Sequence, residues 1–488
     1  DKWSSSLFVH GNTRVSKNDM NDDGFLDNPL AKQINVLNRW QYTNAEKGWV
    51  SFINFRYMDD KKQTGELNFD SDRDRGKKYY WGSEINTERF DVSAKLGYVF
   101  PDMPYQSIGF QNAFNSHDQD SYFGLNQYNI KQKSYYSNLI FNSIINNTMH
   151  KFATGLYFTY DKYGEFVNVN DYSRIDNSIG AFFEYTYDNT EDFSVVLGGR
   201  IDNHNRLGAF ATPRLHVRYN PWEKGVLRFS AGRGKRGANV FAENQQLLAS
   251  SRTFEFLDFN GKMYGLNPEI AWNYGLSFMQ GFLLFGKSAD IGFDFYRTDF
   301  QNQAVVDVMQ SPQQVLFYNL KQKSYANSLQ VEFNYELVKH LNLRTAYKYY
   351  DIQTDYLSGG YQRPLQAKHR FFGNLGYETH IANKGKQWKF DYTFNWLGKQ
   401  QLPNTATNPA KDRLAEYSPS FSVMNMQVTR TFSSTFEIYI GGENIGNYKQ
   451  DHVILGNKNP FGPTFDASIV YGPVFGQMYY AGLRFKIK

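Results

Sequence analysis

The feature that most constrains this chain is an alternation of apolar and polar residues with a period of two. In the stretch 90–100, the even-numbered residues are apolar and most odd-numbered ones are polar or small. The stretch 479–487 places Tyr479, Leu483 and Phe485 on one face and mainly basic or small residues on the other. Segments with this pattern form half-buried strands. No helical periodicity of comparable strength competes, so the sequence predicts an all-β protein.

The connections between these segments alternate between short and long. Short polar turns are expected near 45–48, 220–225 and 432–435. Long polar loops are expected at 17–32, 58–78, 117–132, 161–177, 233–265, 398–417 and 447–476. This gives about 20 strands, with short turns at one edge of the sheet and long loops at the other. Outer-membrane barrels combine about 10-residue alternating segments, short turns at one rim and longer loops at the other, and closure pairs every backbone group in lipid. The pattern therefore predicts a transmembrane antiparallel β-barrel occupying residues 1–488.

Composition agrees with this fold and excludes others. The chain is 18% aromatic, with 36 Tyr and 42 Phe, yet its mean hydropathy is -0.61. No apolar run approaches the roughly 18 residues that a spanning helix needs, and the aromatic content excludes disorder. A net charge of +5 gives nucleic-acid binding no electrostatic support. With no cysteine, the chain carries neither disulfides nor cysteine-based redox chemistry, and no redox cofactor is expected. A soluble β-propeller is the alternative fold, but no repeat of about 40–45 residues is present.

Several motifs together resemble those of TonB-dependent receptors of the outer membrane, particularly the version common in Bacteroidota-type bacteria. The residues that carry the resemblance are Pro213-Arg214-Leu215, Arg218-Tyr219-Asn220-Pro221, Leu227 to Gly234, Leu266 to Gly275, Tyr296 to Phe300, His369-Arg370, Gly442 to Ile445, Phe465 to Ser468 and Tyr471-Gly472-Pro473. Each motif is weak alone, whereas their order along most of 1–488 is fairly specific. In that family these motifs belong to the barrel rather than to a substrate site.

The resemblance implies a barrel of 22 strands preceded by a plug domain that carries the TonB box. Neither plug nor box is recognisable in residues 1–488, so we expect the plug, together with a first hairpin, upstream of Asp1. The implied function is energy-coupled import of a scarce, large solute such as a siderophore, cobalamin or another metal chelate. The implied partners are the TonB complex, the lipid bilayer with its lipopolysaccharide and a surface lipoprotein, in the outer membrane of a Gram-negative bacterium. The alternative is a passive porin, which usually has 16–18 strands.

One loop has the spacing of a calcium site. Asp19, Asn21, Asp23 and Asp27 supply oxygen atoms at positions 1, 3, 5 and 9, and Phe25 supplies a carbonyl at position 7. Position 12 is a leucine, so the bidentate glutamate of an EF-hand is missing, and the flanks look like strands. Two readings stay open: an outer loop stabilised by calcium, and an acidic solvated loop.

A second loop combines cations with aromatic residues. Arg233, Lys235 and Arg236 are followed by Arg252 and Phe254, a set suited to an anionic or planar ligand. The alternative interpretation for any one of these residues is contact with lipopolysaccharide or solvation of the lumen.

Two further features complete the sequence reading. There is no Gly-x-Ser-x-Gly elbow, P-loop or HExxH motif, so no enzymatic activity is expected. Gly482, Phe485 and Ile487 have the spacing of the C-terminal assembly signal of outer-membrane barrels, although the family usually ends on an aromatic residue.

Overall fold

The computed structural model describes residues 2–382 and 385–487. Its strands are β1 (Trp3–Arg14), β2 (Leu30–Asn44), β3 (Trp49–Gly65), β4 (Gly82–Val99), β5 (Ser107–Phe123), β6 (Asn126–Ile145), β7 (Asn147–Val167), β8 (Asn170–Asp171), β9 (Arg174–Asp188), β10 (Phe193–His204), β11 (Gly208–Tyr219), β12 (Gly225–Arg236), β13 (Thr253–Phe256), β14 (Glu269–Leu284), β15 (Lys287–Asn302), β16 (Ala304–Asp307), β17 (Gln314–Asn319), β18 (Ser324–Val338), β19 (Leu341–Tyr356), β20 (Gly359–Gln362), β21 (His369–Glu378), β22 (Gln387–Leu397), β23 (Phe421–Ser433), β24 (Phe436–Glu443) and β25 (Met478–Phe485). The helical elements are α1 (Ser71–Asp74) and the 3-10 turns η1 (Ala242–Leu248) and η3 (Ala410–Asp412).

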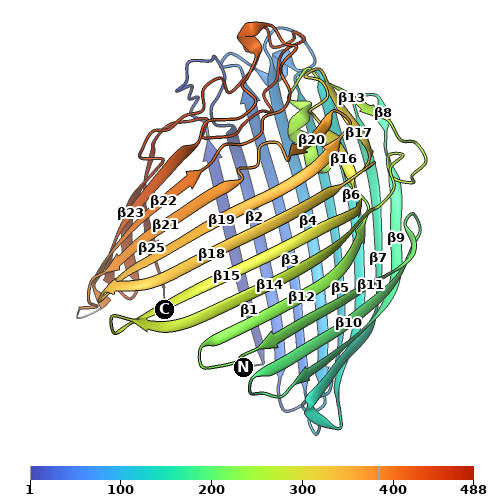
Figure 1. The fold of residues 1–488 in the computed structure, drawn as a ribbon, viewed down its shortest axis with the longest axis vertical. Helices are drawn as coiled ribbons and strands as arrows, with labels where there is room; N and C mark the ends of the chain where they lie inside the picture. The colour runs from blue at the N-terminus through green and yellow to red at the C-terminus, as the bar shows by residue number, and fades with distance from the viewer. Residues whose placement is uncertain (1, 383–384, 488) are drawn as a thin grey trace.

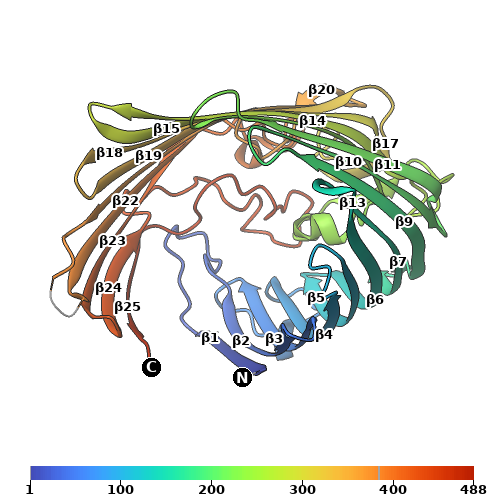
Figure 2. The same ribbon diagram turned by 90° about the horizontal axis from the view of Figure 1, so that it is seen from below.

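One antiparallel sheet forms the wall of the molecule. Each long strand pairs with the next long strand along the chain, from β1 with β2 to β24 with β25. Within the described residues the sheet has 22 strands, and the short β8 and β20 lie beside β7 and β19 as additions to the rim. Figure 2 shows the wall curving around a lumen until β1 and β25 lie on the same side of the molecule. The prediction of a transmembrane antiparallel barrel with about 20 strands is confirmed.

The two rims differ, as the connection lengths predict. At the lower rim in Figure 1 the turns are short, such as Phe285–Gly286 between β14 and β15. Gly48 closes another of these turns with a φ of 71°, and a Cβ atom there would lie 1.8 Å from the carbonyl oxygen of Val99. Only glycine fits such a close backbone approach. The upper rim carries the long connections, which fold inward over the lumen (Figures 1 and 2).

Two of the predicted long loops are wrong, and a third begins later than predicted. Most of 117–132 belongs to β5 and β6, which are joined through Gly124 and Leu125, and most of 161–177 belongs to β7 and β9. In 58–78, β3 continues to Gly65. These segments are rich in polar residues and lack a regular alternation, although Tyr122, Tyr128 and Val167 within them are buried. A ladder of backbone hydrogen bonds does not require an apolar face, so the strands continue into water. A prediction based on hydropathy alone gives a loop in these polar segments.

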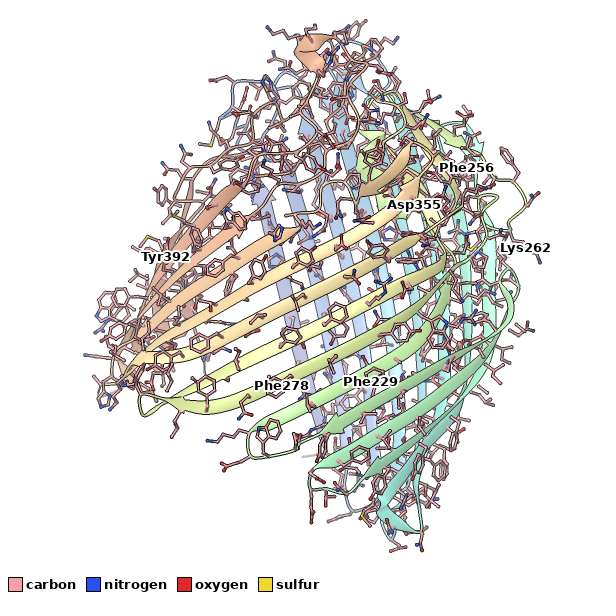
Figure 3. The ribbon with its side chains drawn as sticks, viewed as in Figure 1. Phe229, Phe256, Lys262, Phe278, Asp355 and Tyr392 are labelled. Carbon is pink, nitrogen blue, oxygen red and sulfur yellow. The ribbon has the colours of Figure 1, made fainter. Side chains whose placement is uncertain are left out.

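The wall has its apolar side chains on the outside. Along β7, Leu156 and Phe158 are exposed, with Leu156 at 58%, and Ile201 of β10 is 68% exposed. Figure 3 shows Phe229 and Phe278 on the outer face of β12 and β14. The intervening side chains face the lumen and are largely polar, as in Asn54 and Arg56 of β3. Among the described residues, no helix is long and apolar enough to cross a membrane.

The buried core lies in the upper-rim connections. We call these connections, residues 15–29, 66–81, 237–268, 303–323, 398–420 and 444–477, the cap. They contain most of the largest fully buried side chains, among them Phe317, Phe465, Leu248 and Ile469. A small sheet orders the centre of the cap, in which β17 pairs parallel with β13 and antiparallel with β16. The cap therefore has a hydrophobic core of its own, supported on the ends of the wall strands.

Candidate functional site

Two groups of aromatic side chains form the core of the cap. In the first, the ring centroids of Trp81 and Phe465 lie 4.9 Å apart. The ring of Phe25 lies 6.0 Å from that of Trp81 and 6.1 Å from that of Phe465. In the second, Phe241 lies 5.2 Å from Tyr172 and 5.5 Å from Phe317. Pairs at these separations add to the stability gained from area burial alone. Segments hundreds of residues apart in sequence are thereby held in one surface.

A cavity of about 350 Å³, which we call the mouth cavity, lies between the two aromatic groups. Its lining is Trp81, Phe123, Leu125, Asn126, Val167, Asn168, Asn170, Tyr172, Phe241, Ser250, Ser251, Arg252, Thr253, Phe254, Pro460, Phe461, Gly462 and Phe465. Aromatic rings and short polar groups both contribute to this lining. Pockets with apolar walls and a few placed polar groups are the usual sites for small-molecule recognition.

The amide side chains of the mouth cavity are fixed by local hydrogen bonds. The Nδ2 group of Asn126 donates to the carbonyl oxygens of Leu248 at 2.8 Å and of Ser250 at 3.1 Å. The Nδ2 group of Asn168 donates to Oδ1 of Asn126 at 3.2 Å. The rim of β5–β7 is therefore tied directly to the loop that follows η1, and the cavity has rigid polar walls.

Arg252, which the sequence predicts as a ligand residue, lines the mouth cavity but is held by the protein. Its side chain is 1% exposed, its Nε lies 2.9 Å from Oδ2 of Asp466, and its Nη1 donates to the carbonyl oxygen of Ser311 at 3.0 Å. One guanidinium thus joins three cap segments. Phe254, the other predicted residue here, is half-buried in the second aromatic group, with its ring stacked on Phe317 at 6.3 Å.

A second buried ion-pair network anchors the cap to the wall. Nη1 of Arg174 lies 2.5 Å from Oε2 of Glu165, and Glu165 also accepts hydrogen bonds from the hydroxyl groups of Tyr128 and Tyr264. The Arg174 guanidinium lies over the ring of Tyr163 at 4.1 Å. Tyr264 comes from the cap segment 237–268, so this network fixes that segment on β6, β7 and β9.

The three other predicted ligand residues lie elsewhere. Arg233, Lys235 and Arg236 line a cavity of about 750 Å³ on the wall, which we call the wall cavity. Its lining also includes Arg200 and Arg214, which are paired with Asp202 and Glu184. Arg236 pairs with Glu243 and Glu269 at 2.8 and 2.7 Å. The structure therefore divides the predicted set into two sites, with Arg252 and Phe254 in one and the other three residues in the other.

The predicted calcium loop is closed on itself by hydrogen bonds. The backbone N–H groups of Asp23 and Gly24 donate to the two carboxylate oxygens of Asp19 at 3.2 and 2.9 Å. The N–H of Met20 donates to Oδ2 of Asp27 at 2.7 Å, and the N–H of Phe25 to Oδ1 of Asp23 at 2.8 Å. Three carboxylates thereby converge on one short loop, which packs on the C-terminal cap segment where Asn457 donates to the carbonyl oxygen of Asp23.

Electrostatics in this loop would favour a cation. Burial raises the pKa of Asp23, and the nearby charges of Asp19 and Asp27 raise it further. Burial likewise raises the pKa of Asp27. In the part of the chain that the structure describes, no cluster of three or more His, Asp or Glu side chains has an arrangement that could hold a metal. Asp19, Asn21, Asp23 and Asp27 carry the oxygen atoms that calcium prefers, but the structure does not bring three of the carboxylates into a metal-holding arrangement, so the calcium loop stays a prediction. Phe25 contributes mainly a ring that is buried beside Trp81.

The residues of the predicted assembly signal lie at the end of the wall. The ring of Tyr439 packs over Gly482, where a Cβ atom would lie 2.3 Å from it. Phe485 and Ile487 are exposed on the apolar side of the wall, and Phe485 packs edge-on against Phe436 at 6.4 Å. These residues lie at the C-terminal end of the wall, and their role in barrel assembly stays a prediction.

Sequence reasoning did not identify most of the mouth cavity. Trp81, Asn126, Tyr172 and Phe465 come from four separate parts of the chain and share no local motif. The available signal was the presence of large aromatic residues inside polar loops, since an aromatic side chain in a solvated loop has no partner unless the loop folds onto something.

The chain has a clear family match. The family model described as TonB dependent receptor-like, beta-barrel matches residues 4–445. No curated protein sequence matches the chain.

Solved structures match nearly the whole chain at low identity. A mutant ferric enterobactin receptor of Pseudomonas aeruginosa in complex with enterobactin has a TM-score of 0.71 and 11% identity, covering 99% of this chain and 76% of that one. The siderophore receptor PirA of Acinetobacter baumannii has a TM-score of 0.69 and 12% identity, covering 99% and 75%. FpvA of P. aeruginosa bound to a heterologous pyoverdine has a TM-score of 0.71 and 12% identity, covering 99% and 67%. At these identities the likeness shows a shared fold.

Proposed function

The chain belongs to the TonB dependent receptor-like β-barrel family, and from this premise we propose that it is an outer-membrane transporter that captures a scarce, large solute at its cap. The solute class that we propose is a metal chelate, such as a ferric siderophore or cobalamin. The observation that carries the proposal is the mouth cavity, an aromatic and amide-lined site that is held open by buried contacts between cap segments.

The chemistry of the mouth cavity supports this solute class. Rings from Trp81, Tyr172 and Phe254 offer stacking faces, and Asn168 and Asn170 offer amide groups at its edge. The one cation in the lining, Arg252, is already paired with Asp466, so the cavity favours planar or polar groups over a bare anion. With about 350 Å³, the cavity accommodates part of a chelate, while the rest lies over the cap surface.

The printed names of the structural neighbours point in the same direction. They include a ferric enterobactin receptor and a siderophore receptor, both of Gram-negative bacteria. A pyocin-bound neighbour, the FpvAI–pyocin S2 complex, is also similar, with a TM-score of 0.70 at 12% identity. We extend to this chain the membrane location, energy coupling through TonB and a plug domain, and a surface lipoprotein that delivers the solute. No enzymatic step forms part of the proposal.

The proposal is tested by tryptophan fluorescence on the full chain in detergent. The probes are a ferric catecholate siderophore, a ferric hydroxamate siderophore, cobalamin and, as a comparison, a neutral oligosaccharide. Trp81 lines the cavity, so we expect saturable quenching by one of the three chelates and no saturable response to the oligosaccharide. Phe254→Ala should weaken that response about tenfold, because it removes one stacking face.

The matched control is Trp222→Phe. Trp222 is an exposed tryptophan in the turn between β11 and β12 at the opposite rim, so this variant should bind the probe as the unmodified chain does. Equal loss of binding in Trp222→Phe and Phe254→Ala would contradict a site in the cap. Absence of saturable binding for all chelates, together with a large open conductance in planar bilayers, would instead favour the passive porin.

A further inference from the structure

The small sheet at the centre of the cap has one open edge. Within residues 2–382 and 385–487, β13 pairs only with β17, which pairs on its other side with β16. The N–H groups of Thr253 and Leu257 donate to carbonyl oxygens on the β17 side, at 2.9 Å each. Because successive backbone groups of a strand point to opposite edges, the N–H and C=O groups of Phe254 and Phe256 point away from β17. Among the described residues, these groups have no main-chain partner on the outer side of β13, which we call the open edge.

The open edge borders the mouth cavity. The cavity lining contains five consecutive residues, Ser250 to Phe254, but no described residue of β17. The same lining includes Asn168 and Asn170 at the turn between β7 and β8, and Figure 1 shows both β8 and β13 at the upper rim. Main-chain groups without a protein partner need another donor or acceptor, which water or a ligand can supply. A ligand in the mouth cavity can therefore reach the unpaired main chain of β13.

The two faces of β13 differ in chemistry. Phe254 and Phe256 share one face, where the ring of Phe256 lies 4.8 Å from that of Phe317 and 5.9 Å from that of Tyr172. Glu255 lies on the other face and is exposed, and it forms no ion pair with any residue that the structure describes. A strand added beside β13 would therefore meet aromatic rings on one face and a free carboxylate on the other.

We propose that the open edge binds an extended peptide as an added antiparallel strand, with a basic side chain beside Glu255 and an apolar side chain before and after it. In an antiparallel pair, residues at every second position exchange both of their backbone hydrogen bonds. The peptide residues opposite Phe254 and Phe256 would make these bonds, which supply the affinity, while the side chains supply the specificity. The inference rests on the proposed function, because it uses the mouth cavity as the capture site. It names the solute class as a peptide, either free or as part of a metal chelate.

The open edge matches a peptide main chain better than other polar ligands of similar size. An extended peptide presents N–H and C=O groups at the same spacing as the unpaired groups of Phe254 and Phe256. The charges also discriminate, because Arg252 is already paired with Asp466 at 2.9 Å, whereas Glu255 is free. Opposite charges directly across neighbouring strands stabilise the pair, so Glu255 favours a lysine or arginine in the peptide.

The main-chain contact is tested by isothermal titration calorimetry of the full chain in detergent with a metal-free peptide, acetyl-valyl-lysyl-valine amide. We expect saturable binding. Methylating the backbone nitrogens of both valines should weaken binding at least about tenfold, because these N–H groups point at the open edge. Methylating the backbone nitrogen of the lysine alone should leave binding unchanged, since that N–H points away from β13. Equal binding of the two methylated peptides, or no saturable binding of the unmodified one, would overturn the proposal.

Charge reversal tests the contact with Glu255. Glu255→Lys should weaken binding of the lysyl peptide about fivefold and strengthen binding of the matched glutamyl peptide, because the cross-strand charge pair changes sign. The control is Glu191→Lys, which reverses an exposed charge in the turn between β9 and β10 and should leave both affinities unchanged. Circular dichroism should show the β signal in both variants. Equal effects of the two reversals would overturn the pairing with Glu255.

A last set of probes separates the two sources of peptide, and separates this inference from the proposed function. In one probe a ferric catecholate group replaces the acetyl cap: tighter binding would identify the peptide as part of a chelate, and equal binding would identify a free peptide. A ferric catecholate without any peptide tests chelate capture alone. If it binds while no peptide does, strand addition is overturned and chelate capture stands. If the acetylated peptide binds while none of the chelates does, chelate capture is overturned and strand addition stands.

Discussion

In the wall, Leu156 and Ile201 turn apolar side chains outward, whereas in the cap Leu248 and Phe317 bury theirs against segments from distant parts of the chain. Neighbouring wall strands are joined by long backbone ladders, such as the one between β3 and β4. Cap segments are joined by side chains, through the aromatic groups and through pairs such as Arg252 with Asp466. The difference shows that one chain uses two sources of stability: backbone pairing in lipid, and hydrophobic burial above it.

This comparison predicts that side-chain deletions act mainly on the cap. Wall strands keep their backbone partners when a lipid-facing side chain is shortened. A cap segment has few such ladders, so each lost side-chain contact removes a larger share of what orders it.

The largest effect is expected for Arg252→Met. This change leaves the carboxylate of Asp466 buried without its cation, which costs about 3–5 kcal/mol when a buried pair is broken on one side. We expect the free energy of cap opening to fall by that amount while the wall stays intact, as measured by hydrogen exchange. Arg297→Met, in an exposed pair, should change stability by less than about 1 kcal/mol. An equal effect of the two changes would remove the distinction between buried and exposed pairs.

Leu248→Ala should have the next largest effect. Leu248 is 1% exposed in the cap core, and a buried Leu→Ala change typically costs about 3 kcal/mol through lost burial and an unfilled cavity. Leu156→Ala on the outer wall should cost less than about 1 kcal/mol, since lipid replaces the lost contacts. Guanidinium unfolding of the cap, followed by protease sensitivity, compares the two variants. Similar sensitivities would mean that the cap is no more dependent on packing than the wall is.

A smaller, local effect is expected at the Asp19–Asp27 loop. If the loop binds calcium, Asp23→Asn should weaken binding about tenfold, and chelator should increase protease cleavage within 15–29 only. Because burial raises the pKa of Asp23, protons should displace calcium at a higher pH than for an exposed aspartate. Without calcium the sign reverses: the folded loop holds protons more tightly than the unfolded chain, so it gains stability as the pH falls. Isothermal titration of calcium into the chain at several pH values tests both statements. If adding calcium releases no heat of binding, the segment is an acidic solvated loop and not a calcium site.

The smallest effect on the folded protein is expected for Phe485→Ala. It removes an edge-on pair with Phe436, which is worth about 0.2–1 kcal/mol on a sheet. If the last strand carries the assembly signal, the same change should slow barrel formation in membranes while leaving the unfolding midpoint almost unchanged. Phe293→Ala on the central wall is the control, with no expected delay. Equal assembly rates for the two variants would argue against a signal at the C-terminus.

The wall was largely predictable from sequence because alternation is a local property. The face of Leu483 follows from its neighbours, and the antiparallel barrel follows from strand count and connection length. Alternation fails to predict strands where consecutive residues are polar. Gln119 and Asp120, for example, lie in β5 although their segment is predicted as a loop. The cap was not predictable in the same way. Nothing local to Trp81 indicates that Phe465 will lie beside it, and nothing local to Arg252 indicates that Asp466 will pair with its guanidinium.

The cap is a packed structure that frames the mouth cavity. Hydrogen–deuterium exchange of the ligand-free full chain, resolved by peptide, tests it most directly. We expect the amides of Leu248, Phe317 and Ile469 to be protected for hours, on a scale similar to that of β6 and β7. Exchange of these cap amides within seconds, at the rate of an unstructured peptide, would contradict it.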